Sequence, residues 1–345
     1  MYEHYQNPDG VRYFLAAWTL ASAILALVGN LTVIAAAYKN IIKLDKVTVG
    51  IIVHLALSDI GYTLSGIVTT FPAIQLQRWP FGYTWCVGNK CLTNIFYTMS
   101  TLLVSLFSIN KLFCFVMPFH ARYRSTRTCN MILSLIWVLV TAYAFVTNIY
   151  PDSSLYFNPE AYQCWINYKH HQIFGSIMVI WVCLMGVIII CTTLALLVFL
   201  YVHRSGVLPP IKGTMAIVSV SLIYVLSSAP GAIVMALKMA ERKVHMSETT
   251  TIVLNIVTTY IFYIGTWSNP IVYFFSIRSY GNFIKRCFFK LPEREMSRSS
   301  SGAVVGGQHR ARMITVNNGS VNPGLENDHG VSVDQDHTND ISISP

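Results

Sequence analysis

Seven long apolar stretches make up most of this chain, and each is long enough to cross a lipid bilayer. They run at about 12–38, 47–72, 87–117, 130–149, 173–201, 211–237 and 250–275. A hydrocarbon core of about 30 Å requires roughly 20 residues of α-helix. Charged residues are 11% of the chain, whereas soluble domains carry about 25%. The sequence therefore predicts an all-α membrane protein, folded as a bundle of seven transmembrane helices.

The distribution of basic residues predicts how the bundle is oriented. Most of the 24 Lys and Arg residues follow the first, third, fifth and seventh stretches. Because such residues stay preferentially on the cytoplasmic side, residues 1–11 are expected outside the cell. The net charge of +9 then reflects membrane topology and does not indicate nucleic-acid binding. We expect a multi-pass protein of the plasma membrane, in contact with its lipids, with an extracellular N-terminus and a bundle over 12–275.

The chain after the bundle divides into two segments. Residues 276–290 interleave apolar and basic side chains, which predicts an amphipathic eighth helix in the inner membrane interface, with Cys287 as a palmitoylation candidate. Residues 291–345 are rich in Ser, Gly, Asn and Asp and predict a disordered cytoplasmic tail. Phosphate on the tail would cancel positive charge near the membrane, and the alternative is an inert tail. The candidate phosphorylation sites are Ser297, Ser299, Ser300 and Ser301.

Two polar features inside the apolar stretches indicate a bundle that rearranges. Asn269 and Pro270 lie late in the seventh stretch, where they are costly unless neighbouring helices satisfy the freed backbone groups. Asp59 is the main acid within the second stretch. An acid at membrane depth is expensive and usually faces the interior to serve function. A signalling bundle therefore fits better than a passive anchor.

The cysteines supply one structural prediction. Of the eight, only Cys86 and Cys164 lie at positions expected outside the cell, the first at the top of the third stretch and the second in the long outer loop. A disulfide between them suits the oxidising side of the membrane and would tie that loop over the mouth of the bundle. The alternative is two free thiols.

Short motifs distributed along the chain resemble those of the rhodopsin-like (class A) G-protein-coupled receptors. They are Gly29-Asn30, Leu55-Ala56-Leu57-Ser58-Asp59, Trp79-Pro80-Phe81-Gly82, Trp137, Pro230 and Asn269-Pro270-Ile271-Val272-Tyr273. Within that superfamily, three segments most resemble opsins, and the most similar branch is the peropsin and retinal-photoisomerase group. The segments are Ser58-Asp59-Ile60-Gly61, Trp79-Pro80-Phe81-Gly82-Tyr83 and Cys164-Trp165-Ile166-Asn167-Tyr168.

The chain departs from opsins where they bind retinal. The resemblance places Tyr263 where opsins carry the lysine that forms a Schiff base, and the seventh stretch contains no lysine. Without an amine no imine can form, so no covalently bound retinal is expected. Asn89 occupies the position of the usual counterion, and Thr93 replaces the Asp that binds amine ligands. Lys90 could contact an anionic ligand or extend towards the headgroups. The ligand-pocket candidates are Asn89, Lys90, Thr93, Tyr97, Ser228 and Tyr263.

The activation switch that the resemblance implies is also altered. Asn110-Lys111-Leu112 replaces the Asp-Arg-Tyr motif, and Ser228 replaces the Trp that precedes the proline of the sixth stretch. Asn110 lacks the carboxylate that restrains the cation at rest, and Lys111 lacks the planar Arg fork. We expect weakened coupling to a heterotrimeric G protein, and arrestin is a further expected partner. The switch candidates are Asn110, Lys111, Leu112, Pro230, Pro270 and Tyr273.

A polar cluster around Asp59 leaves two interpretations open. The resemblance implies a sodium-linked cluster of Asn30, Asp59, Ser100 and Asn269, although Gly265 and Ser228 replace two usual members. Alternatively, a neutral Asp59 is hydrogen-bonded to Asn30 and Asn269. No other metal site, nucleotide-binding loop or catalytic triad is evident, so the chain is not expected to be an enzyme.

The sequence therefore predicts an opsin-like receptor that transmits an extracellular or lipophilic signal to a G protein or arrestin. Its ligand could be a small lipophilic molecule such as a non-covalent retinoid, or a peptide. Two alternatives remain: an opsin or photoisomerase that binds retinoid non-covalently, and a receptor-shaped protein without G-protein coupling. A channel or transporter would need additional intramembrane charge or repeat symmetry, and neither is evident.

Overall fold

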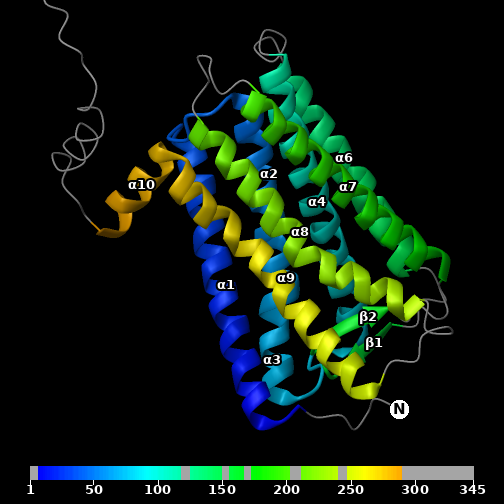
Figure 1. The fold of residues 1–345 in the computed structure, drawn as a ribbon. Coiled ribbons are helices and arrows are strands. Elements are labelled where there is room, and N and C mark those ends of the chain that lie inside the picture. The colour runs from blue at the N-terminus through cyan, green and yellow to red at the C-terminus, as the bar shows by residue number, and fades with distance from the viewer. Residues whose placement is uncertain are drawn as a thin grey trace, which may run out of the picture. The chain divides into compact units, whose positions relative to one another are not determined.

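The computed structural model describes residues 7–117, 125–149, 155–166, 172–202, 211–239 and 247–289. Its long helices are α1 (Asp9–Tyr38), α2 (Lys46–Tyr62), α4 (Gly82–Val116), α6 (Thr126–Ile149), α7 (Gln172–Val202), α8 (Ile211–Met239) and α9 (Glu248–Ser276). The π-helical η1 (Thr63–Ile67) and α3 (Val68–Leu76) continue α2, and α10 (Arg278–Phe289) follows α9. Figure 1 shows these long helices as rods that lie side by side, with α10 projecting from one end. Both ends of each predicted stretch lie within one or two helical turns of the ends of the corresponding rod.

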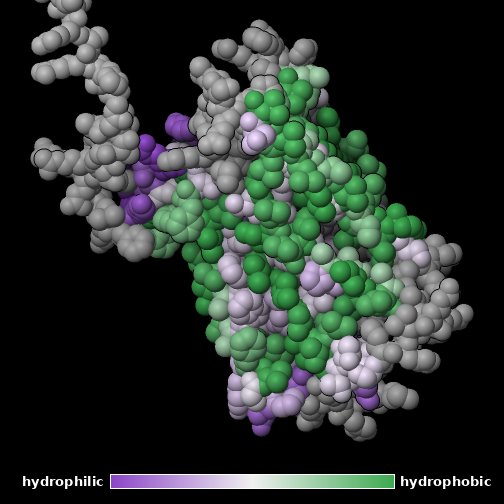
Figure 2. Space-filling view, viewed as in Figure 1, coloured by the Kyte–Doolittle hydropathy of each residue, from purple (hydrophilic) through white to green (hydrophobic). Residues whose placement is uncertain are grey.

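The surface of the bundle has the character of a membrane protein. Among the described residues, six helices are long and apolar enough to cross a membrane, and α8 contributes the shorter apolar segment Val218–Val234. Figure 2 shows apolar side chains along the rods and hydrophilic ones towards the two ends. On α6, Leu135, Val138 and Leu139 are all exposed, as lipid-facing side chains are. The prediction of an all-α seven-transmembrane bundle is confirmed.

The second rod is irregular because of Pro72. Proline has no backbone N–H, and its ring clashes with the carbonyl four residues earlier, so an α-helix must widen or bend there. The π-helical turn Thr63–Ile67 ends directly before Val68, the residue whose carbonyl would clash with the Pro72 ring. Hydroxyl groups donate to nearby carbonyl oxygens, including Thr63 to that of Asp59 at 2.7 Å and Thr70 to that of Gly66 at 2.7 Å. Thr70 lies next to α9, because its Oγ1 is 3.4 Å from the hydroxyl oxygen of Tyr263.

Helices α1 and α9 approach closely because residue 29 is glycine. A Cβ atom there would lie 2.9 Å from Cβ and Cγ of Pro270, which is too close for any side chain. One residue later, Asn30 Nδ2 donates to the carbonyl oxygens of Ala26 and Thr266, both at 2.9 Å. The Gly29-Asn30 pair thus holds the proline-containing part of α9 against α1.

A β-hairpin lies at the end of the bundle opposite α10, and we call this the hairpin end. Strands β1 (Leu155–Asn158) and β2 (Gln163–Ile166) pair antiparallel, with Phe157 opposite Cys164. The disulfide Cys86–Cys164, with 5.6 Å between the Cα atoms, attaches β2 to the first turns of α4. The predicted disulfide is therefore present.

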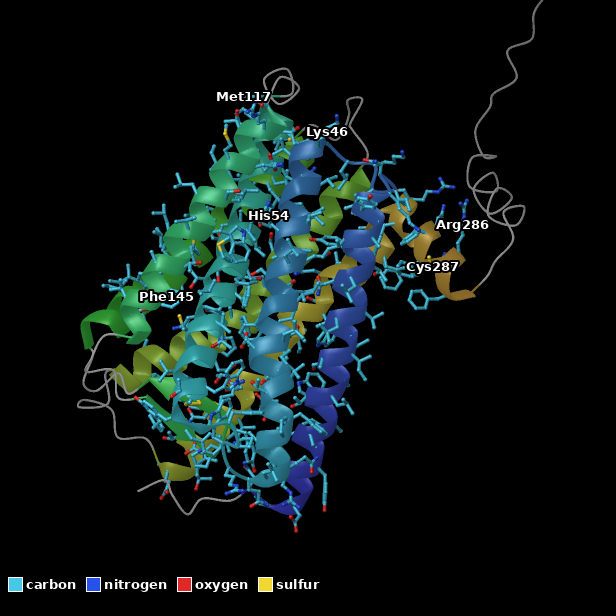
Figure 3. The ribbon with its side chains drawn as sticks, turned by 180° about the vertical axis from the view of Figure 1, so that it is seen from behind. Lys46, His54, Met117, Phe145, Arg286 and Cys287 are labelled. Atoms are coloured by element: carbon cyan, nitrogen blue, oxygen red, sulfur yellow. A yellow bond between two sulfur atoms is a disulfide. The ribbon has the colours of Figure 1, made fainter. Side chains whose placement is uncertain are left out.

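Helix α10 leaves the bundle at the other end, which we call the α10 end (Figure 1). The hydroxyl groups of Tyr280 and Thr32 lie 2.8 Å apart and connect it to α1. A groove of about 390 Å³ runs between α1, α9 and α10, bordered by Phe288 among others. Cys287 is exposed on α10 (Figure 3), and its palmitoylation remains a prediction. The tail serines Ser297, Ser299, Ser300 and Ser301 lie outside the described residues.

Candidate functional site: a buried polar bundle with clusters at both ends

Asp59 lies at the centre of the bundle and joins three helices. Its side chain is 1% exposed. Oδ1 accepts a hydrogen bond from Ser100 Oγ of α4 at 3.1 Å, and Oδ2 accepts one from Asn269 Nδ2 of α9 at 2.9 Å. Three of the four predicted cluster members therefore meet. The fourth, Asn30, instead donates to backbone carbonyls of α1 and α9 and forms no hydrogen bond with Asp59 among the described residues.

The position corresponding to the opsin lysine is filled by a fully buried tyrosine. Tyr263 of α9 is 0% exposed. Its hydroxyl accepts a hydrogen bond from Gln163 Nε2 at 2.6 Å and donates one to Thr70 Oγ1 at 3.4 Å. Because Gln163 directly precedes the disulfide residue Cys164, Tyr263 connects the hairpin to α9 and α3. The side chain of Tyr263 therefore has a structural role, because it connects α9, α3 and β2 by hydrogen bonds.

An aromatic cluster lies next to Tyr263. The ring of Phe262 packs against that of Tyr62 at a centroid distance of 5.1 Å and against that of Tyr97 at 5.0 Å. The three rings come from α9, α2 and α4, so the predicted pocket residue Tyr97 lies between helices. Such rings favour contact with an apolar or aromatic ligand group.

The other pocket candidates lie on two helices. Asn89 is 5% exposed, and its Oδ1 has no hydrogen-bond partner among the described residues. Lys90 forms no ion pair with any residue in the described part of the chain. Thr93 Oγ1 donates to the Lys90 carbonyl at 3.0 Å, and Ser228 Oγ donates to the Tyr224 carbonyl at 2.8 Å. Thr93 and Ser228 thus bond within their own helices, whereas Asn89 and Lys90 keep polar groups available.

Sequence reasoning missed an acid in the hairpin turn. Glu160 is 1% exposed, and its Oε2 accepts a hydrogen bond from Asn255 Nδ2 of α9. Its backbone carbonyl accepts one from Asn7 Nδ2 at 3.2 Å. Asn158 Oδ1 accepts from the backbone N–H groups of Glu160 and Ala161, both at 2.9 Å, which shapes the turn. Glu160 therefore ties the hairpin to α9 and to the segment before α1.

At the α10 end, the altered switch residues lie against the start of α2. We call Asp45, Thr48, Asn110 and Lys111 the Asp45 cluster. Asp45 caps α2, because its Oδ1 accepts from Thr48 N at 2.9 Å, and its Oδ2 accepts from Thr48 Oγ1 at 2.5 Å. Lys111 Nζ donates to the same Oδ2 at 3.1 Å, and Asn110 Nδ2 donates to Thr48 Oγ1 at 2.8 Å. Figure 3 shows Lys46 and Met117 together at this end.

Residue 110 carries no carboxylate, as the sequence indicates, but Lys111 does have an acidic partner. That partner is Asp45, which precedes α2. Burial by itself would raise the pKa of Asp45, but the Lys111 ammonium and hydrogen bonds from Thr48 and Lys111 lower that pKa below its usual value. Asp45 is therefore charged at neutral pH, and its contact with Lys111 is an ion pair.

The remaining switch candidates lie along the same interior. Tyr273 is 2% exposed, and its hydroxyl has no partner among the described residues. Pro230 lies inside α8, Pro270 lies inside α9, and Leu112 is half-buried on α4. Two hydroxyl contacts join α4 to α8: Ser108 to Ser221 at 2.8 Å, and Thr101 to Tyr224. No three His, Cys, Asp or Glu side chains gather as a metal site within the described ranges.

Comparison with known proteins agrees with this architecture. The family described as "7 transmembrane receptor (rhodopsin family)" matches residues 29–273. Melatonin receptor type 1A of Gallus gallus is 26% identical over 162 residues, or 46% of this chain and 44% of the relative. Melatonin receptor type 1A-A of Danio rerio is also 26% identical over 162 residues, or 46% and 45%. The chain thus aligns with less than half the length of these curated relatives.

Among solved structures, the crystal structure of squid rhodopsin has a TM-score of 0.68 and 18% sequence identity. The match covers 90% of this chain and 95% of that chain, and it is a likeness in fold. The family match covers most of the chain, from Gly29 in α1 to Tyr273 in α9. The chain therefore belongs to the rhodopsin family of seven-transmembrane receptors, and it is a receptor and not an enzyme.

Proposed function

We propose that this receptor detects a ligand near the hairpin end and transmits the signal to a G protein or arrestin at the α10 end. The observation that carries the proposal is the bonding of Asp59 to Ser100 and Asn269, next to Pro270. A buried acid shared by three helices makes their positions interdependent, and a proline weakens one of them at the same level. A ligand that moves α9 therefore acts on α2 and α4 as well.

The orientation follows from the basic residues, which concentrate towards the α10 end. The hairpin end then faces the outside of the plasma membrane, and the α10 end faces the cytoplasm. The disulfide at the hairpin end is consistent with this orientation, because disulfides persist on the oxidising side.

The aromatic cluster of Tyr62, Tyr97 and Phe262 favours a small lipophilic ligand. Asn89 and Lys90 lie on α4, about two helical turns before Tyr97 of this cluster. Asn89 offers an unused acceptor, and Lys90 offers an ammonium that forms no ion pair among the described residues. These groups suit an aromatic molecule that carries a hydrogen-bond donor or an anionic group. Melatonin belongs in the first ligand panel, since two relatives are melatonin receptors.

Retinal reconstitution tests the non-covalent alternative. Purified receptor incubated with 11-cis or all-trans retinal is expected to give no red-shifted band and, after borohydride reduction, no retinyl-lysine in the bundle, because Tyr263 stands where opsins carry the reactive lysine. A saturable shift in the retinal spectrum that competes with other lipophilic ligands would support a non-covalent retinoid site. A reduced adduct on any lysine of the bundle would contradict the proposal.

We further propose that Asp59 is a hydrogen-bond hub and not a sodium ligand. A protein donor occupies each carboxylate oxygen, and Gly265 offers no side-chain ligand. The thermal midpoint of the purified receptor is therefore expected to be equal in NaCl and in KCl at the same ionic strength. Asp59→Ala is expected to lower it in both salts, because two buried donors lose their acceptor at a cost of about 1–3 kcal/mol each.

Ser100→Ala is the matched control, since it removes one donor and leaves the carboxylate. A sodium-specific rise of the midpoint in the wild type that disappears in Asp59→Ala would show that sodium binds there. Such a rise would follow mass action and would increase with sodium concentration.

A further inference from the structure

The buried side chain of Lys111 on α4 contacts Asp45, the residue that precedes α2. Its ammonium lies 3.1 Å from Asp45 Oδ2, between residues 66 positions apart in the chain. We infer that Asp45 is the acidic restraint of the cytoplasmic switch, which holds Lys111 in the resting receptor and must release it before Lys111 contacts a transducer. This inference rests on the proposed function and assigns its resting-state partner.

The geometry orients Asp45 for this task. Oδ1 is held by the backbone N–H of Thr48, so the carboxylate cannot rotate freely, and Oδ2 faces Lys111. Thr48 is fully buried, and its hydroxyl accepts from Asn110 while it donates to Asp45. Asn110 therefore positions the acid through Thr48. In this way the Asn of the altered motif supports a carboxylate that it does not itself carry.

The exposure of the pair suits a reversible contact. The Lys111 side chain is 10% exposed and that of Asp45 is 39% exposed. An ion pair with both members deeply buried is difficult to break, because separation leaves an uncompensated charge. With Asp45 partly in water, solvent and salt weaken the pair, and its two members can separate at modest cost. A charged transducer segment could then compete for Lys111.

The direct test measures the reactivity of the Lys111 amine in the full-length receptor. Asp45→Asn removes the charge while Asn remains an equally good helix N-cap, so α2 keeps its start. Brief amine labelling followed by mass spectrometry is expected to show roughly two- to fivefold more modification of Lys111 than in the wild type. Labelling of Lys39, which forms no ion pair within the described residues, should stay unchanged.

Asp9→Asn is the matched control, because it removes a carboxylate that pairs with Arg12 at the hairpin end, 2.9 Å apart. It should leave Lys111 labelling at the wild-type level. Asp45→Glu keeps the charge and should return labelling most of the way to that level. Unchanged labelling of Lys111 in Asp45→Asn would overturn the inference, whatever the receptor does in cells.

Signalling separates the restraint from the proposed function. At equal surface amounts, Asp45→Asn is expected to raise basal nucleotide exchange about two- to fivefold above that of Asp45→Glu and of the wild type. The triple variant Asn110→Asp/Lys111→Arg/Leu112→Tyr shows whether the assay detects coupling. If it couples, raised labelling of Lys111 in Asp45→Asn without raised exchange would overturn the inference that Asp45 restrains the switch. If no variant stimulates nucleotide exchange on any class of G protein, the proposed function is contradicted. The labelling result would still decide whether Asp45 holds Lys111.

Discussion

Replacing either Cys86 or Cys164 by Ser is expected to remove most of the receptor from the cell surface. The disulfide closes a loop of 78 residues and holds the hairpin to α4. Loss of a native disulfide typically costs about 2–5 kcal/mol, a large part of the stability of an ordinary domain. The measurement is binding of an antibody to an N-terminal epitope on intact cells, divided by total receptor.

The matched control is Cys183→Ser, because Cys183 is a free, exposed cysteine of α7. It should leave surface delivery near the wild-type level. The double variant Cys86→Ser/Cys164→Ser should be no worse than either single variant, since each one already breaks the same bond. Free thiols at both positions in surface receptor, or normal delivery of the single variants, would show that the bridge is dispensable.

Replacing Asn110-Lys111-Leu112 by Asp-Arg-Tyr is expected to raise basal nucleotide exchange about tenfold, the effect of roughly 1.4 kcal/mol. Arg presents a planar fork that bonds in two directions, whereas Lys111 is a single point charge on a flexible stem. Without the Arg contact to the transducer, the output of every active receptor is lower, whatever fraction of the receptors is active. Lys111→Arg alone should give a smaller increase in the same assay.

The structure adds a competing effect to this prediction. Asp at position 110 would place a second carboxylate beside Thr48, whose hydroxyl can donate to only one of the two acids. The acid at 110 would then share the cation at 111 with Asp45 and reinforce the resting state. We expect the improved transducer contact to dominate. Asp45→Asn added to the triple replacement should therefore raise exchange further, and a decrease would show the opposite order of effects.

The helices and the disulfide could be predicted because their signals are local or compositional. An apolar stretch of membrane length has one stable conformation in lipid, so the rods follow from composition alone. The partners of Asp59 could also be expected, since a buried acid needs donors and the resemblance supplied Ser100 and Asn269. Side-chain direction could not be deduced in this way. Asn30 was placed in the right region, yet its amide donates to Thr266 of α9.

The two missed acids lie outside the helices, where no periodicity constrains the direction of a side chain. Asp45 precedes α2 and looks like an ordinary N-cap, and nothing local shows that Lys111 approaches it from α4. Glu160 lies in the hairpin turn, and its partner Asn255 is 95 residues away. Both contacts depend on how the rods pack. The one available signal was the position of each acid: Asp45 lies at the start of α2, and Glu160 lies near the disulfide residue Cys164.

One comparison tests most directly whether the Asp45 cluster is the signalling switch of this receptor. Nucleotide exchange is measured for each G-protein class in membranes with equal surface amounts of the wild type, Lys111→Gln, Asp45→Asn and the Asp-Arg-Tyr triple variant. We predict low exchange for the wild type, no increase for Lys111→Gln, an increase for Asp45→Asn and the largest value for the triple variant. Robust wild-type exchange that none of these replacements changes would contradict the account.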